Sequence, residues 1–165
     1  MSAQTALRSI PNEQEPGHTQ PRVTAPRTIV DAPCVLIRPD RAFPSKQGHH
    51  VLEGICAESA GSTALSLHVI SIPPGGRALS HLHRNHESAI YMLEGEAICW
   101  YGEGLRHSFR ISPGEMAYIP AGVPHLPMNA SQDKPVSCVI ARTDANEQES
   151  VHLLPELDDL PHLHS

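Results

Sequence analysis

Three histidines in this chain have a spacing that suits a metal site. His81 and His83 are separated by one residue, and His125 lies further along the chain. Residues i and i+2 of a strand point to the same side of a sheet, so the first two imidazoles are expected to face one point. A histidine on a neighbouring strand can complete three corners of a site. Imidazole binds zinc, copper, iron and nickel, and metal sites with open positions are usually catalytic.

The segments around these histidines resemble the two sequence motifs of the cupin superfamily. The first motif is Gly, five residues, His-x-His, three or four residues, Glu, six residues and Gly, and it is matched by Gly75, His81, His83, Glu87 and Gly95. The second motif is Gly, five residues, Pro-x-Gly, two residues, His, three residues and Asn, and it is matched by Gly114, Pro120, Gly122, His125 and Asn129.

This resemblance covers roughly residues 50 to 142. It implies an all-β fold, a small antiparallel barrel of the jelly-roll or double-stranded β-helix type. It also implies one divalent metal ion per chain, bound by His81, His83, Glu87 and His125. Iron, manganese, zinc and nickel are all compatible with such a site.

The chain departs from the first motif by one residue. Seven residues, not six, separate Glu87 from Gly95, so counting back from Gly95 places the ligand position at Ser88. Because a shift of one residue turns a strand side chain to the opposite face, either a bulge turns Glu87 inward or the site lacks a carboxylate. His86 is an alternative ligand, two residues before Ser88.

Short apolar runs separated by turn residues predict the elements that position these groups. Such a pattern, without helical periodicity, is typical of a sandwich or barrel. The expected strands cover residues 51–57, 64–72, 77–83, 88–95, 96–102, 107–111, 115–120, 125–129 and 136–143. Residues 35–39 are expected to form an edge strand or an arm, and residues 41–50 a loop.

The expected organisation is one barrel domain between two tails. Residues 1–28 are rich in Pro, Gln, Thr and Glu, which predicts a disordered or partner-binding arm. The barrel is expected over residues 29–145, and a C-terminal tail packed on it over residues 146–165. The apolar residues of 29–37 and the exposed sheet edges predict a homodimer.

The composition limits which partners we expect the protein to bind and which cellular compartment we expect it to occupy. The net charge is −6 and no basic run occurs, which disfavours nucleic acid. No apolar stretch approaches the roughly 20 residues that span a bilayer, and no secretory signal is expected at the N-terminus. The four cysteines are widely spaced. We expect Cys56, Cys99 and Cys138 to be buried free thiols, in keeping with a reducing cytoplasm.

The remaining histidines are expected to be surface or structural residues: His49, His50, His68, His107, His152, His162 and His164. Ile90 and Met92 are expected to line the pocket, with Tyr118, Trp100 and Met128 as further candidates and Asn129 as a hydrogen-bonding residue.

The sequence favours a metal-dependent enzyme that acts on a small organic molecule, with dioxygenase-like oxidoreductase chemistry somewhat ahead. The alternatives are a non-catalytic module that binds a metal or small ligand, and a metal-dependent isomerase or epimerase of sugars or sugar phosphates. The last would need arginine or lysine in the pocket. Arg77, Arg84, Arg106, Arg110 and Arg142 are candidates.

Overall fold

Two of the longest strands alternate regularly between buried and more exposed residues. In β3 (Ser66–Ile72) and β10 (Val136–Arg142) every second residue is buried, from the first residue to the last. This period of two gives each strand one face toward the interior. The two strands pair antiparallel, with Val136 opposite Ile72 and Arg142 opposite Ser66.

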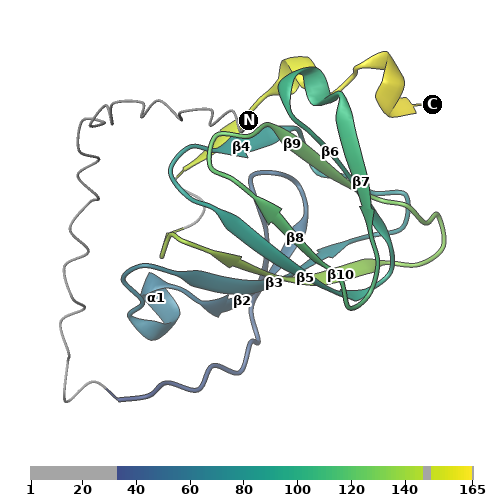
Figure 1. Cartoon of the computed structure of the whole chain (residues 1–165). Coiled ribbons are helices and arrows are strands. Elements are labelled where there is room, and N and C mark those ends of the chain that lie inside the picture. Colours follow the sequence, from purple (N-terminus) through teal and green to yellow (C-terminus); the bar gives the residue numbers. More distant parts are fainter. Residues whose placement is uncertain (1–32, 147–149, 165) are drawn as a thin grey trace, which may run out of the picture. The chain divides into compact units, whose positions relative to one another are not determined.

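The computed structural model describes residues 33–146 and 150–164, and its strands belong to a unit that begins at Val35. The arm predicted for residues 1–28 lies outside the described residues. The strands form two antiparallel sheets (Figure 1). The first sheet contains, in spatial order, β1 (Ala42–Pro44), β2 (His50–Ile55), β3, β10, β5 (Ser88–Glu94) and β8 (Met116–Ile119). The second contains β11 (Val151–Leu153), β4 (His81–His83), β9 (His125–Asn129), β6 (Ala97–Tyr101) and β7 (His107–Ile111).

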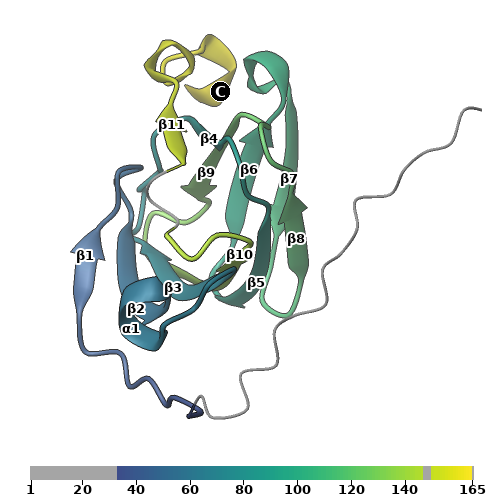
Figure 2. The same ribbon diagram turned by 90° about the vertical axis from the view of Figure 1, so that its left-hand side faces the viewer.

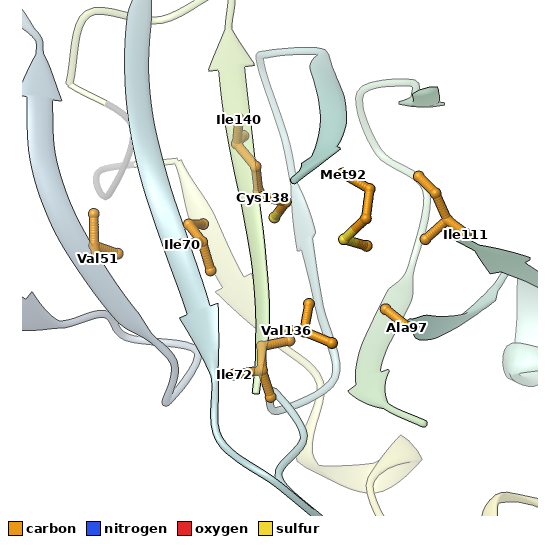
Figure 3. Packing of buried hydrophobic residues seen from close by; sticks show 9 residues of the cluster. All are labelled: Val51, Ile70, Ile72, Met92, Ala97, Ile111, Val136, Cys138 and Ile140. Carbon is orange, nitrogen blue, oxygen red and sulfur yellow. The ribbon is translucent and has the colours of Figure 1, made fainter. Parts of the chain in front are cut away.

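The core lies between the two sheets. Val51, Ile70 and Cys138 come from the first sheet, and Ala97 and Ile111 from the second. Their side chains point into the same space in Figure 3. Two sheets that bury their apolar faces against each other form a sandwich. The predicted all-β jelly-roll fold is thus confirmed.

The short elements differ most from the sequence-based expectation. Residues 41–50 include the strand β1, which pairs with β2, whereas residues 35–39 form no strand. The strand expected over residues 51–57 ends at Ile55, and a single helical turn follows it, α1 (Ala57–Ala60), capped by the Cys56 side chain. The described part of the chain also contains three 3₁₀ turns: η1 (Glu103–Leu105), η2 (Pro155–Leu157) and η3 (Pro161–His164).

The C-terminal segment pairs with the strand that carries the first two histidines. β11 lies antiparallel to β4, with Val151 opposite His83 (Figure 2). Beyond it, the Asp158 carboxylate accepts a hydrogen bond from the Ser80 backbone N–H at 2.7 Å. Leu163 packs in a small buried cluster with Leu105 and Leu126. These contacts cover β4, which would otherwise be an edge strand.

Hydrogen bonds from the Asn129 side chain link the end of β3 to the loop that follows β9. Its side-chain amide donates to the carbonyl oxygens of Ile72, Pro73 and Lys134 at 2.8–3.1 Å. Its Oδ1 accepts from the Ser131 backbone N–H at 2.8 Å. The expected hydrogen-bonding role of Asn129 is confirmed.

The outward face of the β5–β8 edge is apolar and exposed. Tyr91 and Leu93 on β5 and Met116 and Tyr118 on β8 all belong to the large exposed hydrophobic residues, and Met116 is 79% exposed. Four neighbouring apolar side chains on a sheet edge are a surface that a partner could cover.

The cysteines are free. Cys99 and Cys138 are buried, Cys56 is partly buried, and Cys34 is exposed. Burial raises the pKa of the Cys99 thiol to about 12, which makes it a poor nucleophile. Within the described ranges, no helix has the length and apolar character needed to cross a bilayer.

Candidate metal centre

Two adjacent strands bring the three predicted histidines together. His81 and His83 lie on β4, two residues apart, and His125 begins β9 directly opposite His81. All three are at most 3% exposed. One nitrogen from each ring can be chosen so that the three atoms lie within 4.8 Å of one another. The structure therefore brings together the three histidines that the sequence motifs single out, and their role as metal ligands stays a prediction.

A turn that contains Gly122 contacts β4 and positions His125 beside it. Gly122 has a φ of +77°, in the left-handed region that favours glycine. Its backbone N–H donates to the His83 carbonyl oxygen at 2.7 Å. The turn that follows Pro120 thus contacts the strand of the other two histidines three residues before His125 enters its own strand.

Backbone carbonyls orient two of the imidazoles. The Nδ1 atom of His81 lies 2.7 Å from the Leu79 carbonyl oxygen, and Nδ1 of His125 lies 3.0 Å from that of Val123. A carbonyl only accepts, so Nδ1 carries the proton in both rings and Nε2 keeps its lone pair. Metal-binding histidines usually have such an acceptor on the second nitrogen. These two acceptors are backbone groups, which the sequence motifs do not identify.

Burial keeps the three rings neutral. Burial first, together with the positive charge of Arg142, lowers the pKa of His125 to about 4 and that of His83 to about 2. Burial and the neighbouring His125 hold the pKa of His81 well below its usual value. Neutral imidazole is the form that binds a metal ion. These donors therefore fit a divalent cation.

Glu87 differs from its predicted place. It is exposed, and its carboxylate accepts a hydrogen bond from the Tyr118 hydroxyl at 2.7 Å. Ser88, the first residue of β5, is 2% exposed and lines the cavity beside the histidines. The inward bulge expected at Glu87 does not form, because strand parity gives the inward position to Ser88. The cluster therefore contains three histidines and no Glu87.

His86 packs against the histidine cluster. Its ring stacks on His83, with ring centroids 4.2 Å apart. The Ser150 hydroxyl lies 2.6 Å from its Nδ1, and the Asp144 carboxylate lies 3.5 Å from the same atom. His86 is not in the group of three, so the alternative ligand suggested by the sequence is a packing neighbour of His83.

A small cavity opens beside the three histidines. Its volume is about 60 Å³, well above the roughly 10–15 Å³ that a cavity needs to hold one water molecule. The walls are mostly apolar and include the predicted Ile90 and Met92. Trp100 and Met128 pack instead in the Leu105 cluster, and Tyr118 is on the outer surface. No carboxylate among the described residues lines this cavity.

Two further residues line the cavity, His49 and Arg142. His49 was expected to be a loop residue with no role in the site, and Arg142 was only one of five arginines named as candidates for a sugar-phosphate pocket. The alternation of inward and outward residues along a strand could have identified both. Arg142 follows Val136, Cys138 and Ile140 at intervals of two, and His49 precedes Val51 by two. His50, His107 and His152 are exposed as expected, while His68 is buried and accepts the Gly54 backbone N–H.

Comparison with known proteins agrees with this geometry. Residues 68–141 match the family model described as a cupin domain. No curated protein sequence is similar enough to the chain to count as a match.

Several solved structures share the fold at low sequence identity. An oxalate oxidase is 18% identical, with a TM-score of 0.62 over 78% of this chain and 69% of its own. The oxalate decarboxylase of Lactobacillus farciminis, in a formate complex, is 18% identical, with a TM-score of 0.58 over 69% of this chain. The chain spans only about a third of that decarboxylase, 33% of its length. An uncharacterised protein of Klebsiella pneumoniae with a double-stranded β-helix domain is 20% identical, with a TM-score of 0.54 over 67% of this chain and 88% of its own.

Proposed function

Since the chain belongs to the cupin superfamily, we propose that it is a metal-dependent enzyme that acts on a small organic acid. In this proposal His81, His83 and His125 hold one divalent ion, and the adjoining cavity holds the acid. The observation that carries the proposal is the buried group of three histidines with ligand atoms within 4.8 Å of one another.

The charge of the site favours an anionic ligand. Three neutral imidazoles leave the full positive charge on a divalent ion, and no described carboxylate lines the cavity to offset it. Arg142, 4% exposed, lines the same cavity. In a mostly apolar cavity, the positive charges of the ion and of Arg142 would attract an anionic group more strongly than in water. A carboxylate of the ligand would be such a group.

The size of the cavity favours a ligand of few atoms. A volume of about 60 Å³ suits an acid the size of formate or oxalate and is small for a sugar phosphate. Arg77, Arg84 and Arg110 also lie away from the cavity, in contact with Asp159, His152 and Glu96 respectively. These observations argue against the isomerase alternative.

In this proposal the histidines bind the metal ion and the apolar residues of the cavity exclude water. His81 and His125 present oriented lone pairs because backbone carbonyls hold their Nδ1–H groups. Ile90, Met92 and their apolar neighbours keep the surroundings dry, which strengthens every electrostatic contact in the site. Iron or manganese would supply redox chemistry there, whereas zinc or nickel would act as a Lewis acid. We place oxidation of the acid by dioxygen first, partly by analogy with the oxalate oxidase fold.

The test is an assay of the purified full chain for bound metal, followed by oxygen uptake with formate, oxalate, glycolate, simple phenols and sugars. Metal-dependent oxygen uptake with one or more acids is expected, and His125→Ala should abolish it. Stoichiometric metal and acid binding without turnover under any condition would instead identify a non-catalytic binding module.

A further inference from the structure

The connection between β1 and β2 carries a histidine into the cavity. The loop over residues 45–49 is fixed by backbone bonds: Ser45 N–H donates to the His49 carbonyl at 2.9 Å, and Gly48 N–H donates to the Ser45 carbonyl at 3.0 Å. Gly48 has a φ of +91°, which suits glycine. These bonds hold the loop in one conformation just before β2 begins at His50.

The same loop is joined to the strand of the metal centre. The Leu79 backbone N–H donates to the Gln47 carbonyl oxygen at 2.7 Å, while the Leu79 carbonyl oxygen contacts His81 Nδ1 at 2.7 Å. One residue therefore links the loop on one side and an imidazole of the cluster on the other. This connection fixes the position of His49 relative to the three histidines.

His49 is buried with both polar atoms unsatisfied. The residue is 4% exposed, and neither Nδ1 nor Nε2 has a hydrogen-bond partner among the described residues. A buried polar group without a partner is costly and rare in native proteins. Burial also lowers the pKa of the ring to about 3, so at neutral pH the imidazole offers one N–H donor and one acceptor.

His49 belongs to the wall of the cavity but not to the metal cluster. His49 lines the cavity together with His81, His83 and His125, whereas the group whose atoms converge contains only the last three. The cavity is therefore the place where a partner for its ring nitrogens can lie.

We propose that His49 is a ligand-binding residue of this site, whose ring N–H donates a hydrogen bond to a carboxylate oxygen of the acid held at the metal centre. The assignment rests on the proposed function, because the metal and the acid are its premises. It adds a specificity-determining residue from outside both sequence motifs. An acid with an oxygen in reach of both the metal and His49 is favoured over a neutral molecule of the same size, because a hydrogen bond to a charged group is stronger than one between neutral groups.

The experiment uses the full chain loaded with Co²⁺, with formate and oxalate as probes and the cobalt absorption spectrum as the readout. His49→Phe keeps an aromatic ring of similar shape and removes both nitrogens. His50→Phe is the matched control, because His50 is the exposed neighbour in the same chain segment. We expect His49→Phe to bind cobalt fully and to lose at least about tenfold in affinity for the better-bound probe, a change that corresponds to 1.4 kcal/mol. His50→Phe should match the wild type.

The outcomes separate the two claims. Equal probe affinity in wild type and His49→Phe, both carrying one cobalt ion, would overturn the role of His49 and leave the metal centre intact. Wild-type protein that takes up no cobalt, or whose cobalt binds neither probe, would overturn the proposed function and this assignment with it. If His49→Phe does not fold, His49→Gln and His49→Leu decide: Gln should bind the probe more tightly than Leu, and equal affinities would refute the hydrogen bond.

Discussion

Replacement of Glu87 tests whether the metal site has a fourth, carboxylate ligand, as the sequence motif implies, or three histidines alone, as in the structure. The motif resemblance makes Glu87 a fourth ligand, whereas the structure places its carboxylate against the Tyr118 hydroxyl on the outer surface. Loss of a residue that merely orients a metal ligand typically lowers metal affinity ten- to a hundredfold, and loss of a direct ligand should cost at least as much. An exposed carboxylate outside the group of three should change it by less than about threefold, because solvent and salt screen its charge.

The assay is a competition titration of Zn²⁺ or Co²⁺ against a chelator of known affinity, with wild type, Glu87→Ala and His125→Ala side by side. We expect Glu87→Ala to overlay the wild type and His125→Ala to lose affinity by more than a hundredfold. Tyr118→Phe is the control for the surface hydrogen bond and should also overlay the wild type. A tenfold or larger loss in Glu87→Ala alone would show that Glu87 turns inward when metal binds, and the three-histidine account would be refuted.

Three further predictions concern the fold around the site. Asn129→Asp should destabilise the protein by about 2–4 kcal/mol in urea unfolding, more than Asn129→Ala, because a carboxylate oxygen would face three carbonyl oxygens in place of the donor; equal effects would contradict this. The pKa of His68 is lowered by burial to about 4, so the unfolded chain takes up a proton first, and the metal-free protein should lose stability as the pH falls from about 6.5 towards 4. In His68→Gln that slope should flatten by up to about 1.4 kcal/mol per pH unit, and an unchanged slope would count against it. Light scattering should show a dimer of about twice 17.9 kDa, which Tyr91→Glu with Met116→Glu should convert to a monomer; a wild-type monomer would exclude this use of the β5–β8 edge.

The sequence predicted the long strands well because each buries one face. Burial alternates along the whole length of β3 and β10, with apolar residues at most of the buried positions, and β7 and β9 have the predicted bounds, 107–111 and 125–129. The three-residue strands β1 and β11 are too short to show a period. β11 pairs with β4, which is distant in the sequence and therefore absent from any local pattern, whereas β1 pairs with the next strand, β2, over only three residues.

The same distinction holds for the site. His81, His83 and His125 could be predicted because their spacing and flanking turns are local features of the chain. The orientation of Glu87 could not, because the inserted residue allows two parities and only the pairing of Ser88 with Arg142 and Ile119 selects one. His49 was assigned to a surface loop because its burial depends on the contact between its loop and Leu79, a residue far along the chain.

The central claim is that His81, His83 and His125 together hold one divalent ion. The most direct test is elemental analysis of the full chain after saturation with metal and removal of excess, comparing wild type, the double variant His81→Ala/His83→Ala and the exposed-site control His50→Ala. The account predicts one metal ion per chain in wild type and control and less than about a tenth of that in the double variant. One full equivalent in the double variant, with its fold intact, would contradict it.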